Sequence, residues 1–378
     1  MQFANVGLLS IGYLLPPQKV SSEEIETELK PIYQRLKLPE GRLRLMSGIG
    51  ERRLWERGTR ISDMSSRSCR HALHAANFDP SNVGCLIHAS VCREYLEPAT
   101  ACRVHHLCNL PDACWVYDVS NACLGILNGA VQIATAIEQG SIQAGIVVGT
   151  EDSRGLMEAT LAQLLSDETL TRQSIKPAFA SLTIGSGSCA FLLVDRRKYP
   201  EASPLHAAVV RANTKFHALC ESDQDQAGGN MQPTMNTDSE QLLHAGVSTG
   251  VATFDAFLNE SNWQRSDIDR TVCHQVGSAH RKLMLESLKL PIEHDFSVFE
   301  FLGNTGSVAL PTALALGIDR KGIAPGDRTG LLGIGSGINS VMIAKTLRQT
   351  YVSGEDLAAS SPMTPLHYLY PMTQLHYL

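Results

Sequence analysis

The chain has 378 residues, 43% of them hydrophobic and 19% charged, a composition typical of a globular protein with two domains or two closely joined halves. Its formal net charge of -6 does not indicate the basic face of a nucleic-acid-binding protein. The N-terminal apolar run lacks the Lys and Arg that open a signal peptide, and no segment reaches the about 18 consecutive apolar residues of a membrane span. We therefore expect a cytoplasmic protein that neither binds nucleic acid nor spans a membrane.

Apolar runs alternate with helical patterns along the first 200 residues. The N-terminal "MQFANVGLLSIGYLLPPQ" predicts a strand, and similar runs follow at 84–91, 114–120, 144–150 and 188–194. Between them, stretches such as "LGILNGAVQIATAIEQG" have the apolar spacing of a buried helix. This alternation predicts an α/β architecture with buried strands.

The same series recurs after residue 205. The strand-like runs are "LHAAVVRAN", "RTVCHQV", "RTGLLGIGSG" and "NSVMIAKTL", and helical patterns at 242–260 and 278–290 lie between them. The recurrence predicts two similar lobes that face each other, with an N-terminal lobe over residues 1–200 and a C-terminal lobe over residues 201–350.

Two segments do not fit this alternation. Residues 220–240 are polar and without periodicity, which indicates either a surface loop or a mobile lid over an active site. The chain ends in a near-duplicate, "PMTPLHYL" at 362–369 and "PMTQLHYL" at 371–378. We expect residues 351–378 to be an extension outside the fold.

Cys123 differs in its position from the other cysteines. The chain has ten cysteines without any C-x-x-C spacing, so we expect reduced thiols that mostly pack in the core. Cys123 lies between a strand-like run and a buried helical pattern, and the start of a helix lowers the pKa of a thiol through its dipole and its free N–H groups. Position alone leaves a nucleophile and a packing cysteine equally open.

The second half presents a histidine and an asparagine at comparable positions. His274 ends an apolar run just before a helix that begins near Ser278, and Asn304 lies in the Gly-flanked turn of "FLGNTG". Taken singly, such a histidine is more often a core residue and such an asparagine a turn former. Together with Cys123 they supply a nucleophile and two polar groups that can hold an oxyanion.

The Gly-rich "LLGIGSGIN" at 331–339 lacks the features of a nucleotide-binding loop, because it has neither the Walker Lys-Ser/Thr nor the third spaced glycine. Its glycines predict a close approach of the backbone to another segment. The pair His105 and His106, near Cys108, has poor spacing for a metal site.

Four segments together resemble the thiolase superfamily of condensing enzymes, in the branch that contains β-ketoacyl-ACP synthase III. They are "DVSNACLGILNG", "HQVGSAH", "FLGNTGSVALP" and "LLGIGSGINS", and the resemblance extends to about residue 348. "SVCREYLEPATA", "LKPIYQRLKLPEG" and "GIGERRLW" are most similar to the OleA type, which joins two fatty acyl-CoA molecules head to head. The resemblance implies the five-layered αβαβα thiolase fold, two pseudo-equivalent lobes, a homodimer, and acyl-CoA or acyl-ACP as substrates with no cofactor or metal.

The resemblance also implies a role for each residue. Cys123 would take the acyl group, and His274 and Asn304 would bind the second thioester and stabilise its enolate. The backbone N–H groups of Cys123 and Gly337 would form the oxyanion hole. Glu97, the glutamate of "YLEP", would be the base that removes the α-proton, acting in the site of the partner subunit.

The role of Glu97 distinguishes two possible condensation reactions. A synthase III makes its carbanion by decarboxylating malonyl-ACP, whereas joining two ordinary acyl-CoAs requires a base. We expect an acyltransferase of lipid metabolism that makes a β-ketoacyl product by non-decarboxylative Claisen condensation. The alternative is a synthase III that condenses acyl-CoA with malonyl-ACP in fatty-acid biosynthesis, with Glu97 a surface residue before Pro98.

Position 50 departs from the synthase III pattern. These enzymes usually read "GIRERR" where this chain has "GIGERR", so Gly50 replaces an arginine associated with the CoA phosphates, as it does in the OleA type. Two further classes stay open: a non-catalytic partner subunit, disfavoured by the presence of all three site residues, and a hydrolase that uses the same Cys and His.

Overall fold

The computed structural model describes residues 1–222 and 235–358, and its long strands form one continuous sheet in the order β11-β12-β13-β8-β1-β7-β6-β4-β5, with β14 paired to β1. The strands are β1 Val6–Leu15, β2 Gln18–Ser21, β3 Glu51–Leu54, β4 Cys85–Ala89, β5 Trp115–Val119, β6 Ala144–Glu151, β7 Gly187–Asp195, β8 Ser203–Ala212, β9 Cys220–Ser222, β10 Met235–Thr237, β11 Arg270–Cys273, β12 Arg328–Gly335, β13 Asn339–Thr346 and β14 Tyr351–Asp356. The α-helices are α1 Ser22–Glu28, α2 Lys30–Leu36, α3 Arg42–Ser47, α4 Ile61–Ala75, α5 Thr100–Leu107, α6 Gly125–Glu138, α7 Arg154–Ser166, α8 Ser239–Ser261, α9 Ser278–Leu288, α10 Phe299–Leu302 and α11 Ala309–Asp319.

The sheet folds over into two layers at the contact between β1 and β8. These strands pair only at Gly7 with Pro204 and Leu8 with Ser203, whereas β1 pairs with β7 along most of its length. Such a short contact lets the sheet turn, so β5, β4, β6, β7, β1 and β14 form one layer and β8, β13, β12 and β11 form the other.

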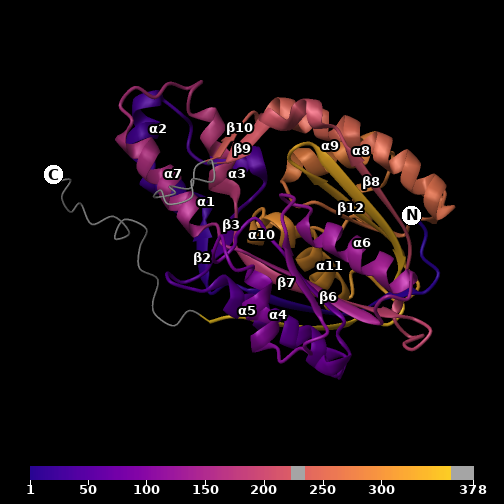
Figure 1. Ribbon diagram of the computed structural model, residues 1–378. Helices are drawn as coiled ribbons and strands as arrows, with labels where there is room; N and C mark the ends of the chain where they lie inside the picture. The colour runs from indigo at the N-terminus through magenta and orange to yellow at the C-terminus, as the bar shows by residue number, and fades with distance from the viewer. Residues whose placement is uncertain (223–234, 359–378) are drawn as a thin grey trace.

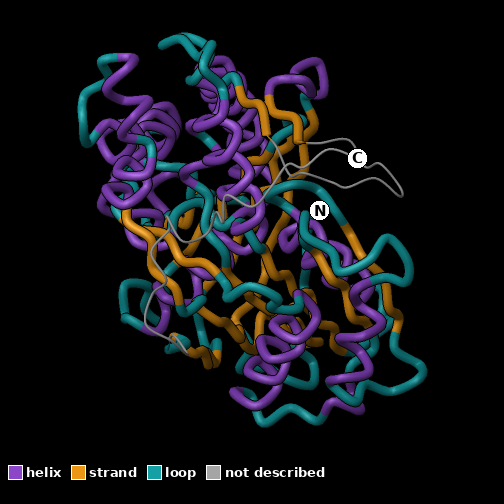
Figure 2. Tube along the Cα trace, turned by 90° about the vertical axis from the view of Figure 1, so that its left-hand side faces the viewer, coloured by secondary structure: helices purple, strands orange, loops and turns teal. Residues whose placement is uncertain are grey.

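Helices lie between the two sheet layers and outside each of them (Figures 1 and 2). Helices α6 and α11 fill the space between the layers, while α4 and α5 cover one outer face and α8 and α9 the other. Neighbouring residues of one strand enter different cores: Leu331 of β12 packs in the central core and Leu332 under α8 and α9. Strands buried on both faces explain the continuous apolar runs, and the result is the five-layered αβαβα arrangement that the resemblance implies.

Strand β5 corrects one expectation. Its sequence predicts a buried strand, yet the side chains of Trp115 and Tyr117 are 47% and 36% exposed. The reason is its place at the edge of the sheet, where β4 pairs with one side and no strand of the described residues pairs with the other. A sequence run shows its apolar character but not whether a neighbouring strand covers it.

The end of the chain corrects a second expectation. We expected residues 351–378 to lie outside the fold, but Tyr351–Asp356 forms β14, which pairs in parallel with Ser10–Leu15 of β1. The duplicated segment at 362–378 lies outside the described residues, as does 223–234, the centre of the expected loop or lid. The ends of that loop form the short β9–β10 hairpin.

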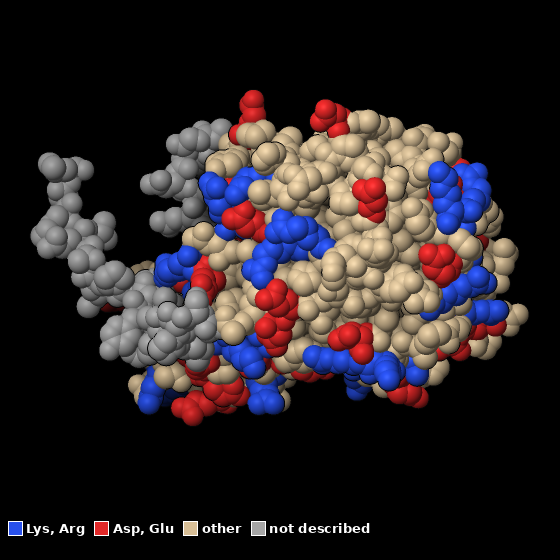
Figure 3. Space-filling model, turned by 90° about the horizontal axis from the view of Figure 1, so that it is seen from below, with Lys and Arg blue, Asp and Glu red and all other residues tan. Residues whose placement is uncertain are grey.

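Charged side chains of both signs are interspersed on the face shown in Figure 3, among broad areas with neither sign. Within the described ranges, no helix has both the length and the apolar character needed to cross a bilayer.

Candidate active site

The candidate site lies where parallel strands end together. Strands β5 and β6 flank β4 in parallel, with His88 level with Asp118 on one side and Val148 on the other. Three segments therefore leave the same edge of the sheet: the loop that carries Glu97 follows β4, and the turn that carries Cys123 follows β5. The third strand, β6, ends on Glu151 at this edge, which is where α/β folds usually place reactive groups.

Cys123 lies in a tight turn between β5 and α6. Ala122 adopts the left-handed conformation with φ of 44°, and α6 begins at Gly125. The Gly-rich end of β12 approaches this turn so closely that a Cβ added to Gly335 would lie 3.5 Å from the backbone nitrogen of Cys123. The sequence prediction of a close backbone approach is therefore confirmed, and Gly337 follows two residues later in the same turn.

The ionisation of Cys123 corrects the expectation of an acidic thiol. Burial raises the pKa of the Cys123 thiol to about 12, and the Glu151 carboxylate and the Cys220 thiol add to the shift. The helix starts only at Gly125, so the thiol precedes the first turn, and the dipole does not outweigh desolvation and a neighbouring negative charge. In the free protein Cys123 is a thiol and not a thiolate at neutral pH.

His274 directly follows β11 at the corresponding edge of the second sheet layer. Its backbone N–H donates to the carbonyl of Leu332, 3.1 Å away, three residues before Gly335 in β12. The ring is buried, and Nδ1 has no hydrogen-bond partner among the described residues. Burial, with a smaller contribution from His280, lowers the pKa of His274 to about 3, so its imidazole is neutral near pH 7.

Asn304 is held by its backbone and by its own side chain. Its N–H donates to the Thr183 carbonyl at 3.0 Å, and its carbonyl accepts from the Gly185 N–H at 2.9 Å. Its Oδ1 accepts from the N–H of Gly306 at 3.1 Å, so the amide nitrogen is the group that a ligand can use. Asn304 is thereby presented with a fixed orientation at the start of the turn that leads into α11.

The loop between β4 and α5 carries two glutamates in different surroundings. Glu94 is largely buried and accepts hydrogen bonds from the backbone and side chain of Ser62, and it pairs with Arg60 at 3.3 Å. Glu97 is exposed on the single chain. In one chain Cys123 therefore follows β5, His274 follows β11 and Asn304 follows α10, while the Glu97 side chain is exposed.

Comparison with known proteins identifies the family. Residues 45–177 match the family model described as "Thiolase, N-terminal domain", and residues 258–345 match "3-Oxoacyl-[acyl-carrier-protein (ACP)] synthase III C terminal". An acyl-CoA:acyl-CoA alkyltransferase of Shewanella oneidensis is 37% identical over 91% of this chain and 99% of its own length. A crystal structure of an alanine variant of Xanthomonas campestris OleA has a TM-score of 0.86 and 32% identity, covering 92% of this chain and 98% of that one. The chain belongs to the OleA branch of the thiolase superfamily.

Among the curated relatives, two named synthase III are more distant from this OleA-branch chain. A crystal structure of a protein named 3-oxoacyl-(acyl carrier protein) synthase III, from Xanthomonas oryzae pv. oryzae, is 31% identical over 92% of this chain with a TM-score of 0.86. The β-ketoacyl-ACP synthase III of Koribacter versatilis is 22% identical over 88% of this chain and 95% of its own length. The order of similarity among the curated relatives matches the finer assignment made from "YLEP" and "GIGERR".

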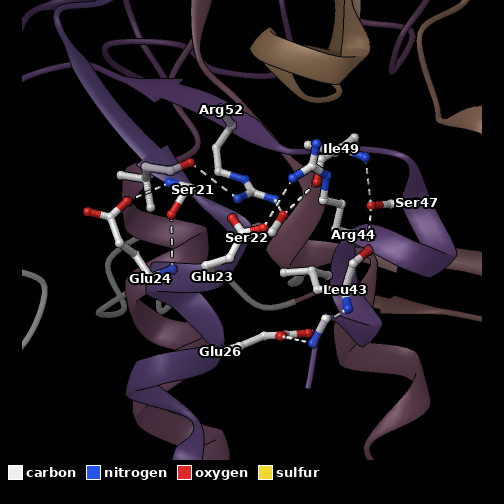
Figure 4. Close-up of polar contacts among 12 residues, drawn as sticks. Ser21, Ser22, Glu23, Glu24, Glu26, Leu43, Arg44, Ser47, Ile49 and Arg52 are labelled. Atoms are coloured by element: carbon white, nitrogen blue, oxygen red, sulfur yellow. Dashed lines mark hydrogen bonds and ion pairs between the residues drawn. The ribbon is translucent and has the colours of Figure 1, made fainter. Parts of the chain in front are cut away.

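Another arginine, Arg44, lies beside position 50, where synthase III enzymes usually have an arginine and this chain has Gly50. A Cβ added to Gly50 would lie 3.6 Å from the guanidinium carbon of Arg44, which extends from α3 (Figure 4). Arg52 of the same motif is buried instead, and it donates to the carbonyl of Val20 and to Oγ of Ser22. In this OleA-branch chain, Arg44 therefore places a cation beside position 50, where it also pairs with Glu23 at 3.4 Å.

Glu151 is a further candidate site residue that the sequence analysis did not name. It ends β6 at the same sheet edge as Cys123 and contacts the turn that follows Asn304. The available signal was an acidic residue immediately after the apolar run "AGIVVGT", at the carboxyl end of a predicted strand.

Proposed function

We propose that this protein joins two fatty acyl-CoA molecules head to head by a non-decarboxylative Claisen condensation. The observation that carries the proposal is the difference between the two carboxylates of the β4–α5 loop. Glu94 is already bound by Ser62 and Arg60, whereas the Glu97 carboxylate is exposed and is therefore the one available to act as a base. A condensation without loss of carbon dioxide needs a base for the α-proton, and Glu97 is placed on a loop that starts at the site edge. The greater similarity to an enzyme named acyl-CoA:acyl-CoA alkyltransferase supports the same reaction.

In the first half-reaction Cys123 attacks the thioester carbonyl of one acyl-CoA. The sulfur–acyl bond forms, the bond to the CoA sulfur breaks, and the thiol proton passes to the departing CoA. The raised pKa of Cys123 fits this order, because the proton leaves only when the carbonyl is attacked. The backbone N–H groups of Cys123 and Gly337 hold the oxyanion of the tetrahedral intermediate.

In the second half-reaction the carbonyl of another acyl-CoA lies between His274 and Asn304. The neutral imidazole of His274 donates a hydrogen bond, as does the amide nitrogen of Asn304, and both strengthen as the oxygen gains charge. Glu97 takes the α-proton, and the enolate carbon attacks the acyl group on Cys123. The Cys123 sulfur leaves and recovers a proton through Glu97, which gives a β-ketoacyl-CoA and restores the enzyme.

We propose further that Glu97 acts in the site of a partner subunit within a homodimer. Within residues 1–222 and 235–358, one edge of β5 has no pairing strand, and this edge strand carries two exposed aromatic side chains, Trp115 and Tyr117. Exposed edges of this kind commonly pair with another chain, and a two-fold axis there would set β5 against its own copy. The exposed Tyr95 and Leu96 adjoin Glu97 on the neighbouring loop, so the same interface carries the base towards the second chain.

An assay with purified enzyme and a long-chain acyl-CoA alone tests the proposal. We expect a β-keto product, detected by mass spectrometry, without any malonyl donor, and its loss in Cys123→Ala. Strict dependence on malonyl-ACP would favour the synthase III alternative, and release of free fatty acid without condensed product would favour a hydrolase.

A further inference from the structure

Glu151 is buried at the site edge, although the two half-reactions assign it no step. Glu151 is the last residue of β6, and only 5% of its surface is exposed. Burying a carboxylate is costly unless hydrogen bonds replace its water, so the partners of Glu151 indicate what it does.

The partners of Glu151 come from two catalytic segments. Oε1 accepts from Oγ of Ser307 at 2.5 Å, from its N–H at 3.3 Å, and from the N–H of Val91 at 3.1 Å. Oε2 accepts from the N–H of Cys92 at 3.3 Å. One carboxylate therefore joins the turn that follows Asn304 to the start of the loop that carries Glu97.

Packing reinforces these hydrogen bonds. Gly306 has φ of 57°, and a Cβ added there would lie 3.2 Å from Cγ of Glu151. The Ser307 hydroxyl also donates to the carbonyl of Ala89, the last residue of β4. The turn thus rests directly on the Glu151 side chain, and a glycine is what allows the approach.

Glu151 also acts electrostatically on the nucleophile. The titratable groups that interact with the Cys123 thiol are Glu151 at the end of β6 and Cys220 in β9, and the carboxylate has the larger effect on its pKa. Around Glu151 itself lie Cys92 of the following loop, whose pKa is raised by burial and then by Glu151, and His88 of β4, whose pKa burial lowers although nearby carboxylates offset part of the shift. Neutral His274 lies at the end of β11 in the other sheet layer, beside His280.

We propose that Glu151 is a positioning residue that holds the Asn304 turn and the start of the Glu97 loop in place, with its carboxylate beside the Cys123 thiol. The proposal rests on the condensation proposed above, since it assigns Asn304 and Glu97 to one reaction. It predicts two separable effects, because the charge acts on the thiol and the hydrogen bonds act on the loops.

Two substitutions separate these effects. Glu151→Gln removes the charge but keeps one oxygen, and we expect the half-maximal rate of Cys123 alkylation by iodoacetamide to move at least one pH unit lower. Glu151→Asp keeps the charge but shortens the side chain, and we expect an unshifted alkylation profile with kcat at least tenfold lower and KM little changed. Glu286→Gln, an exposed glutamate on α9, is the matched control.

The pH profile of alkylation is read by peptide mass mapping and needs no acyl substrate. It therefore tests the role of Glu151 even if the condensation assay fails. An unshifted profile in Glu151→Gln overturns the proposal. Should that variant not fold, Ser307→Ala, which keeps the charge and removes the 2.5 Å hydrogen bond, takes its place. A severalfold lower kcat with unchanged KM then supports the proposal, and a wild-type kcat overturns it.

Discussion

His274 and His280 are buried imidazoles with few internal partners. Neither ring nitrogen of His280 has a hydrogen-bond partner among the described residues, and the same is true of Nδ1 of His274. Burial lowers the pKa of His280 to about 4 and that of His274 to about 3, from an ordinary value of 6.5. Both rings are held neutral, which leaves His274 able to donate to a carbonyl without carrying charge.

This burial predicts that the free energy of unfolding decreases as the pH is lowered below about 6.5. The unfolded chain binds these protons near pH 6.5 and the folded chain only near pH 3 to 4, so the stability is present above pH 6.5 and is lost below it. Each histidine contributes about 1.4 kcal/mol per pH unit to the slope between these limits. Urea unfolding at pH 7, 6 and 5 should show a clearly shallower slope for His280→Leu, and an identical slope would contradict the pKa shift.

Arg44 gives a second prediction at this scale. If its guanidinium contacts a CoA phosphate, Arg44→Ala should raise the KM for acyl-CoA severalfold with kcat unchanged, and added salt should reduce the difference. Lys282→Ala, another exposed cation, serves as the control. Equal KM values for wild type and Arg44→Ala would remove Arg44 from the CoA site.

At the scale of the elements, the proposed dimer interface rests on the exposed edge strand β5. Trp115→Glu places a charge on its exposed face and should give a monomer by size-exclusion chromatography, with condensation lost at the same time. Ile292→Glu, at a residue that is 45% exposed elsewhere on the surface, should leave the oligomeric state unchanged. A dimeric Trp115→Glu protein would place the interface elsewhere.

The strands differ in how well the sequence predicts them. The long central runs were found because burial on both faces leaves continuous apolar segments, as in "AGIVVGT" and "SCAFLLV". The edge position of β5 depends on the strand order, which local patterns do not specify. Strand β14 was missed because it is short and largely polar, and it is a strand only through its pairing with β1.

The sequence indicates those candidate site residues that lie next to a recognisable strand, helix or glycine-rich turn. Cys123, His274 and Asn304 each end or follow a recognisable element, and the Gly335 approach follows from the glycine spacing. The position of Glu151 at a strand end was a sequence signal, but its hydrogen bonds to the 304–307 turn depend on tertiary contacts. The raised pKa of Cys123 depends on burial and on Glu151, which local sequence does not specify.

The whole molecule is expected to work as a dimer with shared sites. Mixing Cys123→Ala with Glu97→Gln subunits, after reversible dissociation, should restore activity, because a mixed dimer has one site with both groups. Random reassortment then gives about a quarter of the wild-type activity. Two inactive parents that stay inactive when mixed would place Glu97 in the site of its own chain.

The most direct test follows the acyl group in Glu97→Gln. Intact-protein and peptide mass spectrometry after incubation with a long-chain acyl-CoA should find the acyl group on Cys123, while the β-keto product formed by the wild type is missing. Cys123→Ala should carry no acyl group. Condensed product at the wild-type rate from Glu97→Gln would contradict the account, because the α-proton would then be removed without Glu97.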